Sequence, residues 1–228
     1  MKVVIPGGTG QVGTALGRAL RGKGHQVVVL SRRAAGEGQI LRDGERPGPW
    51  VREIDGCDVV INLAGRSVSC RYTKETLTEM MRSRVRSARV VGQAIAAARR
   101  PPRAWLQMST ATIYAHTHGA PNDEVTGVIG GSEAGVPGYW AFSVDIAQAW
   151  ERELDDADVA ATRKGSVASR DGDDPGQGRG VRSAVKDGTP GAGRPDRRRR
   201  AVRVVDPRGR LHRRGPLRHR PGQSDRAG

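Results

Sequence analysis

Short apolar runs alternate with longer segments of helical periodicity over the first two thirds of the chain. Four of these runs are apolar with little polar alternation, at residues 2–5, 26–30, 58–65 and 104–108. Such runs are typical of parallel strands that are covered on both faces. The segments between them carry apolar residues at the spacing of an amphipathic helix. The alternation predicts an α/β fold, a Rossmann-like doubly wound parallel sheet that is incomplete at its C-terminal side.

The helix predicted for residues 73–99 has the clearest ends. Thr73 is a favourable N-cap residue, and Pro101 and Pro102 stop the helix because proline cannot continue it. Its predicted apolar face consists of Met81, Val85, Ala88, Val91, Ala94 and Ile95. A further helix is predicted over residues 139–155, with Ile146, Ala149, Trp150 and Leu154 facing inward.

Two parts of the chain carry weaker signals. Residues 34–49 are rich in glycine, proline and charge, which is typical of a loop. The helix and strand that a long Rossmann half has there are therefore expected to be short or absent. One more strand is predicted to begin at Val159, where a short apolar run follows the last helix.

A glycine-rich turn follows the first strand directly and leads into the first helix. Its sequence, GGTGQVG at residues 7–13, places glycines at a three-residue period inside a βαβ unit. Gly7 would let the chain turn sharply, Gly10 would let the backbone approach a pyrophosphate, and Gly13 would let the helix pack closely on the sheet. The helix N-terminus would then face the phosphate charge. An ordinary strand-to-helix turn does not explain three glycines, so we predict a dinucleotide site.

The end of the second strand bears on which dinucleotide is bound. Ser31, Arg32 and Arg33 follow the strand, and no acidic residue appears before Glu37. An acidic residue at this point holds the ribose hydroxyls of NAD, whereas an arginine suits the 2′-phosphate of NADP. NADP is therefore expected ahead of NAD. The alternative is that these arginines are simply solvated.

The formal net charge of +15 is concentrated in the last part of the 228-residue chain. Residues 162–228 contain 19 Lys or Arg and seven Asp or Glu, whereas residues 1–161 are nearly balanced. All eight aromatic residues and all four methionines precede residue 162. A segment of this composition cannot bury enough apolar area to offset the entropy of ordering it. We therefore expect a domain at 1–161 and a basic low-complexity tail at 162–228.

Two hypotheses account for this tail. The favoured one is an out-of-frame translation of a GC-rich gene, beginning inside the strand that Val159 opens. The other is a genuine basic tail that contacts nucleic acid or anionic surfaces, although it has no aromatic residues for stacking on bases. Resequencing the gene distinguishes them, because an intact single frame through codon 165 contradicts the first.

The remaining signals favour a cytoplasmic location and give no indication of a disulfide or of a metal site. The N-terminal apolar run does not resemble a signal peptide, and no apolar run is long enough for a membrane span, so neither is expected. Cys57 and Cys70 form no disulfide or zinc pattern, which favours a reducing compartment. His116 and His118 lack a third ligand at a suitable spacing, so no metal site is predicted.

Six segments together resemble the extended short-chain dehydrogenase/reductase superfamily. The resemblance is strongest to its NAD(P)-dependent epimerase/dehydratase-like family, in particular to an actinobacterial branch with a cell-division-inhibitor label. The segments run in the family's order and are residues 7–13, 29–32, 60–65, 82–85, 109–114 and 149–151.

The resemblance implies a nicotinamide cofactor but leaves catalysis open. The superfamily uses a Ser or Thr after the fifth strand and a Tyr-x-x-x-Lys pair, whose lysine lowers the pKa of the tyrosine. Thr110 matches the Ser/Thr position. Tyr139 is followed four residues later by Ser143, and alignment on Trp150 and Glu151 places Ser143 and Ala147 where the pair belongs. The pair is therefore absent.

The predicted site thus has a cofactor part and a smaller catalytic part. Thr110, Tyr114 and Tyr139 are the catalytic candidates, and a structural role is the alternative for both tyrosines. The cofactor candidates are Gly7, Thr9, Gly10, Gln11, Val12, Gly13, Ser31, Arg32, Asn62, Leu63, Ala64, Gly65 and Ser109. The expected function is an epimerase/dehydratase-like oxidoreductase on a nucleotide-sugar-like substrate. A dinucleotide-binding regulatory or vestigial protein without turnover is the alternative.

Overall fold

A computed structural model gives the fold for residues 1–33, 36–117, 122, 127–159 and 161–169, and for three later strands. The strands are β1 Lys2–Pro6, β2 Gln26–Ser31, β3 Gln39–Leu41, β4 Val59–Asn62, β5 Ala104–Thr110, β6 Arg163–Ser169, β7 Ser183–Gly188, β8 Val202–Val205 and β9 Leu211–His212. The helices are α1 Gln11–Gly22, α2 Val51–Ile54, α3 Lys74–Ala96, α4 Gly138–Asp155 and the 3-10 turn η1 Ala111–Ile113.

The strands form one sheet in the order β3-β2-β1-β4-β5-β6-β7-β8-β9. The first six are parallel to one another, and β7, β8 and β9 continue the sheet in antiparallel pairing. The chain fills the sheet outward from β1 to β3 and then returns to the other side of β1 with β4. The strand order reverses between β1 and β4, and ligands of open α/β sheets bind at the carboxyl ends of the strands at such a point.

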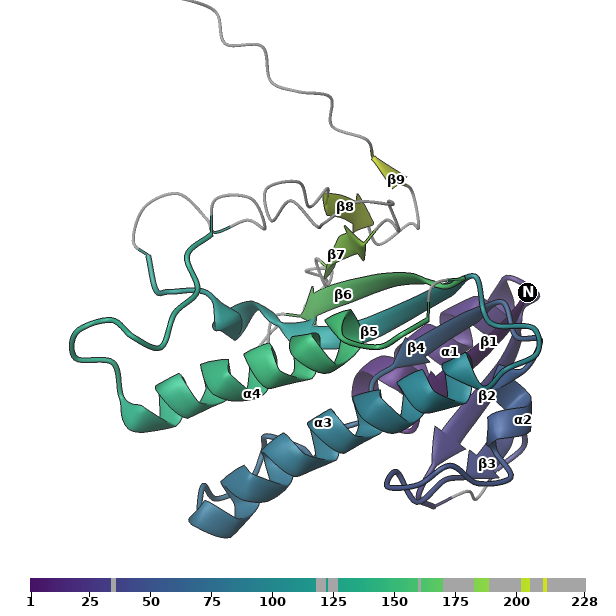
Figure 1. Cartoon of the computed structure of the whole chain (residues 1–228), viewed down its shortest axis with the longest axis horizontal. Coiled ribbons are helices and arrows are strands. Elements are labelled where there is room, and N and C mark those ends of the chain that lie inside the picture. Colours follow the sequence, from purple (N-terminus) through teal and green to yellow (C-terminus); the bar gives the residue numbers. More distant parts are fainter. Residues whose placement is uncertain are drawn as a thin grey trace, which may run out of the picture.

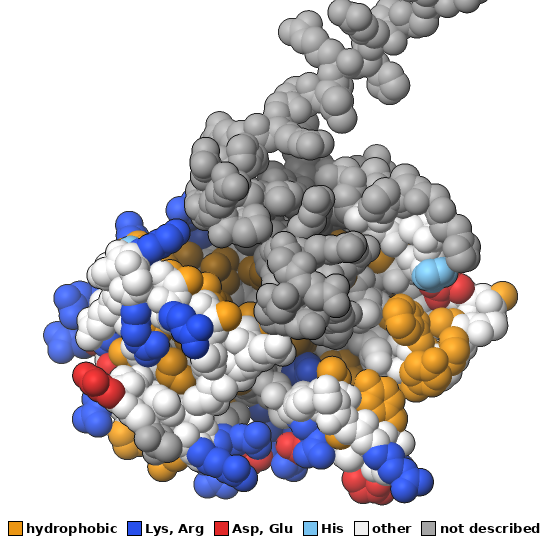
Figure 2. Space-filling view, turned by 180° about the vertical axis from the view of Figure 1, so that it is seen from behind, with side chains coloured by type: hydrophobic (Ala, Val, Ile, Leu, Met, Phe, Trp, Pro, Cys, Tyr) orange, Lys and Arg blue, Asp and Glu red, His pale blue; other side chains and the backbone are white. Residues whose placement is uncertain are grey.

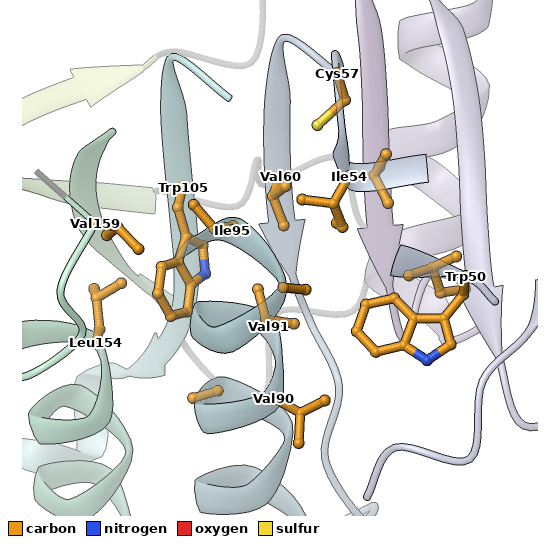
Figure 3. Close-up of a cluster of buried hydrophobic side chains, with 14 of the residues drawn as sticks. Trp50, Ile54, Cys57, Val60, Val90, Val91, Ile95, Trp105, Leu154 and Val159 are labelled. Carbon is orange, nitrogen blue, oxygen red and sulfur yellow. The ribbon is translucent and has the colours of Figure 1, made fainter. Parts of the chain in front are cut away.

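Helices cover the parallel sheet on both faces, as Figure 1 shows. On one face, Leu16 and Leu20 of α1 pack against β1 and β2. On the other face, α3 and α4 lie side by side and enclose the larger core with α2. Figure 3 shows the centre of that core, where Trp105 of β5 lies against α3. The predicted doubly wound α/β fold is confirmed.

Several predicted details need correction. The loop expected at 34–49 contains β3, a three-residue strand that pairs with β2, and a four-residue helix follows it. On α3 the buried methionine is Met80 rather than Met81. The last parallel strand begins at Arg163 rather than Val159, because a turn intervenes in which Thr162 N donates to Val159 O at 2.9 Å.

Much of the predicted tail stays outside the described residues. Residues 170–182, 189–201, 206–210 and 213–228 belong to this part. The division at residue 161 and the shifted reading frame therefore stay predictions. Within the described residues, no helix is long and apolar enough to cross a membrane.

The N-terminus of α3 is closed by a reciprocal pair of threonines. Thr76 N donates to Thr73 Oγ1 at 3.3 Å, and Thr73 N donates to Thr76 Oγ1 at 2.8 Å. This capping box satisfies N–H groups that have no partner inside a helix.

Replacing Thr73 with alanine should therefore lower the free energy of unfolding by about 1 kcal/mol, which urea denaturation measures. Thr78→Ala is the matched control, because the Thr78 hydroxyl only donates back to Lys74 O on the exposed side of the same helix. Equal losses in the two variants would contradict the assigned cap.

Candidate cofactor site

The glycine turn begins with a backbone conformation that only glycine adopts easily. Gly7 has a φ of +77°, in the left-handed region, and its N–H donates to Leu30 O of β2 at 2.8 Å. A Cβ at Gly7 would lie 2.6 Å from the Cα of Ala64, in the segment that follows β4. The first strand therefore turns into α1 in direct backbone contact with the end of β4.

Gly13 and Gly10 differ in what surrounds them. Gly13 was predicted to let the helix pack closely on the sheet. A Cβ at Gly13 would instead lie 2.5 Å from the Cα of Gly8, so at this position the first turn of α1 packs against the glycine turn. A Cβ at Gly10 would meet nothing closer than Gly7 O at 3.7 Å. The fold requires glycine at position 13. At position 10 it leaves open space, which suits the close approach of a ligand.

The first turn of α1 presents uncapped N–H groups. Gly10 is the N-cap residue, no side chain caps the helix, and no acidic residue lies in its first turn. Gln11 and Val12 in that turn are exposed. The helix dipole and these free N–H groups favour an anion. A cradle shaped by missing Cβ atoms next to such a helix end fits the pyrophosphate of a dinucleotide.

At the end of β2, Ser31 connects the glycine turn to the following loop. Its hydroxyl lies 3.4 Å from Thr9 Oγ1, donates to Arg33 O and accepts from Arg33 N. Arg32 is exposed. The structure thus places Thr9 beside Ser31, and Arg32 follows directly after the end of β2.

The end of β4 is fixed by the side chain of Asn62, which is fully buried. Its Oδ1 accepts from Ala64 N at 3.2 Å and from Ser87 Oγ at 3.1 Å, while its Nδ2 donates to Gln107 Oε1 at 2.9 Å. A direct cofactor contact by this side chain does not fit its burial. Asn62 instead holds Ala64 in the position that packs on Gly7, and Leu63 and Gly65 flank that residue.

A buried cation extends this network. Arg42 donates to Ser87 Oγ at 3.1 Å and to Ser87 O at 3.2 Å, and its guanidinium lies 4.9 Å from the centre of the Trp50 ring. Burial lowers the pKa of Arg42 to about 10, which the nearby carboxylate of Asp43 partly opposes. This network could not be predicted from the sequence, because Arg42 lies in the segment 34–49, which was predicted to be a loop.

Ser109 and Thr110, the two candidate residues at the carboxyl end of β5, have different hydrogen-bond partners. Ser109 is buried and its hydroxyl donates to Glu151 Oε1 of α4 at 2.6 Å, so this hydroxyl is engaged inside the protein. Thr110 Oγ1, at the edge of the sheet, accepts from Thr112 N at 3.3 Å. Glu151 is a site residue that we had not predicted, although it is part of the segment 149–151 that carried the family resemblance.

The two tyrosine candidates lie in different surroundings. Tyr114 packs against a small apolar cluster that includes Ile113, Val144 and Ala147. Tyr139 lies in the first turn of α4 and is 57% exposed. Ala147, at one of the positions expected for the catalytic pair, is 1% exposed within that cluster. The structure thus leaves no phenol–lysine pair on this part of α4.

The described residues also bear on other kinds of site. They contain no group of three His, Cys, Asp or Glu side chains placed to hold a metal ion, and His118 lies outside them. Figure 2 shows Lys and Arg side chains in several separate groups over the visible part of one face.

The sequence profile of the NAD dependent epimerase/dehydratase family matches residues 3–131. Human epimerase family protein SDR39U1 is 34% identical over 127 residues, a match that covers 54% of this chain and 42% of the human protein. Epimerase family protein YfhF of Bacillus subtilis is 34% identical over 121 residues, covering 50% of this chain and 39% of the relative. The chain therefore spans about two fifths of the length of these relatives.

The fold is shared with solved structures of other proteins. The crystal structure of human SDR39U1 (isoform 2) with NADPH has a TM-score of 0.60 and 29% identity, covering 74% of this chain and 53% of that one. The nucleoside-diphosphate sugar epimerase of Corynebacterium glutamicum has a TM-score of 0.55 and 26% identity, covering 74% of this chain and 33% of that one. Because the family profile matches more than half of its residues, this chain belongs to the NAD dependent epimerase/dehydratase family.

Proposed function

We propose that this chain binds a nicotinamide dinucleotide at the carboxyl edge of its sheet and forms part of an epimerase/dehydratase-like oxidoreductase. The observation that carries the proposal is the turn at residues 7–13, whose backbone path excludes side chains at Gly7 and Gly13. The turn lies where the strand order reverses, next to an uncapped helix N-terminus. The pyrophosphate would rest on this turn.

NADP is the proposed form of the cofactor. Arg32 is exposed at the end of β2, next to the pair formed by Thr9 and Ser31. A guanidinium at this position offers several N–H donors and a positive charge to a 2′-phosphate. The human relative crystallised with NADPH supports the same choice.

The chemistry proposed for the bound cofactor is the transfer of a hydride to or from its nicotinamide ring. Thr110 stands at the carboxyl end of β5, two strands from β1 in the sheet, and would face the substrate side of the site. A nucleotide-sugar-like substrate is proposed because the structural neighbour from Corynebacterium glutamicum is a nucleoside-diphosphate sugar epimerase.

Binding of a dinucleotide without turnover is the second candidate, and α4 supplies the observation that favours it. Ala147 is buried among apolar side chains, and the Ser143 hydroxyl donates to Tyr139 O at 3.0 Å. Neither residue can lower the pKa of a tyrosine as a lysine does. Titration with NADPH, followed by an assay with oxidised cofactor and nucleotide sugars, distinguishes the two. Tight binding without any change in cofactor oxidation state supports the second candidate.

The Arg32→Ala variant tests the proposed cofactor preference. Loss of the guanidinium should reduce the ratio of NADPH to NADH affinity by about tenfold, equivalent to about 1.4 kcal/mol. Isothermal titration with both cofactors measures the ratio. Arg33→Ala is the matched control, since it removes the neighbouring exposed guanidinium. An unchanged ratio in the Arg32 variant would refute the assigned role.

A further inference from the structure

A hollow of about 230 Å³ opens beside the glycine turn, between α1, β2 and the turn that precedes β3. Thr9 lines it on the side of the glycine turn, and Glu37 and Gln39 line it on the side of β3. Arg21 of α1 also lines it, and its Nη2 donates to Val27 O of β2 at 3.3 Å. The sequence placed Glu37 six residues beyond the end of β2, apart from the cofactor residues. In the fold, Glu37 lines the same hollow as the residues of the glycine turn.

Backbone hydrogen bonds hold Glu37 at this position. Gln39 N donates to Gly36 O at 3.1 Å and closes the turn that contains Glu37. Val29 N then donates to Gly38 O at 2.8 Å, which attaches the turn to β2. Glu37 is exposed, and within the described part of the chain it forms no ion pair. Its carboxylate is therefore available to a ligand in the hollow.

The hollow adjoins the place where the adenosine ribose of a dinucleotide would lie. Thr9, in its lining, is 3.4 Å from the Ser31 hydroxyl at the end of β2. The 2′ position of that ribose carries a hydroxyl in NAD and a phosphate in NADP, and it lies near the end of this strand. A carboxylate accepts a hydrogen bond from the hydroxyl, whereas it repels the phosphate.

We infer that Glu37 is a specificity-determining residue that opposes Arg32 in the choice between the two cofactors. The inference rests on the proposed function, because it assumes that a dinucleotide occupies the glycine turn. Arg32 attracts a 2′-phosphate from the end of β2, and Glu37 repels it from the turn before β3. The chain therefore has a weaker preference for NADP than Arg32 alone would give.

The test compares NADPH and NADH affinities of the full chain by isothermal titration. Glu37→Gln removes the charge and nearly keeps the shape, and it should raise the ratio of NADPH to NADH affinity roughly tenfold. Glu37→Lys should raise the ratio further. The gain should shrink as the salt concentration rises, because exposed charges are screened. Glu45→Gln is the control, since Glu45 follows β3 and pairs with Arg82 and Arg86 instead.

The possible results separate this inference from the proposed function. If the wild-type chain binds neither cofactor, the proposed function fails and the inference fails with it. If the chain binds either cofactor and the Glu37→Gln ratio equals the wild-type ratio, the inference alone is overturned. An equal gain in the Glu45→Gln control also overturns it, because the effect would then reflect net charge rather than position.

Discussion

Replacing Gly7 with alanine should abolish measurable dinucleotide binding and lower the free energy of unfolding by about 3 kcal/mol. A left-handed conformation costs an L-residue about 1–2 kcal/mol, and Gly7 has a φ of +77°. The new methyl group would also lie 2.6 Å from the Cα and 2.7 Å from the N of Ala64. These are backbone atoms, and the neighbouring Leu63 N donates a hydrogen bond to Pro6 O at 2.8 Å. The ends of β1 and β4 would have to separate. Urea denaturation and titration with NADPH measure both effects.

Two further glycines distinguish a damaged fold from a blocked site. Gly10→Ala should leave the free energy of unfolding within about 1 kcal/mol of wild type, because the nearest atom to the added Cβ is 3.7 Å away. It should still weaken NADPH binding, since the methyl group enters the space left for the pyrophosphate. Gly22→Ala, at the end of α1 with nothing within 4 Å, should change neither quantity adversely. Full NADPH affinity in the Gly10 variant would contradict the assigned phosphate position.

The elements that could be predicted from the sequence are those whose own residues determine them. β1 and β2 are continuous apolar runs, and α3 is long enough for its apolar residues to show a helical period. Thr73 marks the start of α3 by its capping chemistry. β3 has only three residues and exists because Val29 to Ser31 of β2 offer it a pairing edge. Its hydrogen bonds depend on pairing with β2, ten residues earlier in the chain, which the pattern of three residues cannot reveal.

The strand β6 also could not be predicted from its own residues. Its sequence, RKGSVAS, lacks the apolar run of a buried parallel strand, yet it pairs with β5 from Ala104↔Arg163 to Thr110↔Ser169. Lys164 finds its partners at the end of α4, where its Nζ donates to Asp155 O at 2.7 Å and to Ala157 O at 3.0 Å. Burial lowers the pKa of Lys164, partly opposed by nearby aspartates. Backbone pairing and these contacts place β6 where its composition would not.

The site likewise contains residues that the sequence could predict and residues that it could not. The glycine turn is a local motif, so its position and its relation to α1 followed from residues 7–13 alone. Glu37 and Arg42 reach the site through contacts between distant parts of the chain, such as Arg42 with Ser87, 45 residues apart. Asn62 was predicted from its place at the end of β4, but its side chain faces the interior, since side chains alternate across a strand.

Replacing Trp105 with alanine should lower the free energy of unfolding by about 3–5 kcal/mol, which is enough to unfold a marginally stable domain. Trp105 has no exposed surface and belongs to the core cluster that joins β5 to α3 and α4 (Figure 3). A Cβ at Gly92 of α3 would be 3.3 Å from its ring, so the indole packs tightly against this helix and its removal leaves a cavity. Urea denaturation of both proteins measures the loss.

Trp105→Phe should lower the free energy of unfolding far less, although the phenyl ring is smaller than the indole. The buried indole Nε1 has no hydrogen-bond partner among the residues that the structure describes, so the phenyl ring removes an unsatisfied donor together with the lost volume. Trp140→Ala supplies the matched comparison, because Trp140 is only partly buried at the edge of the small cluster around Val144. A loss at Trp140 equal to that at Trp105 would contradict the central position of Trp105, because the cost of truncating a tryptophan depends on the cavity that it leaves.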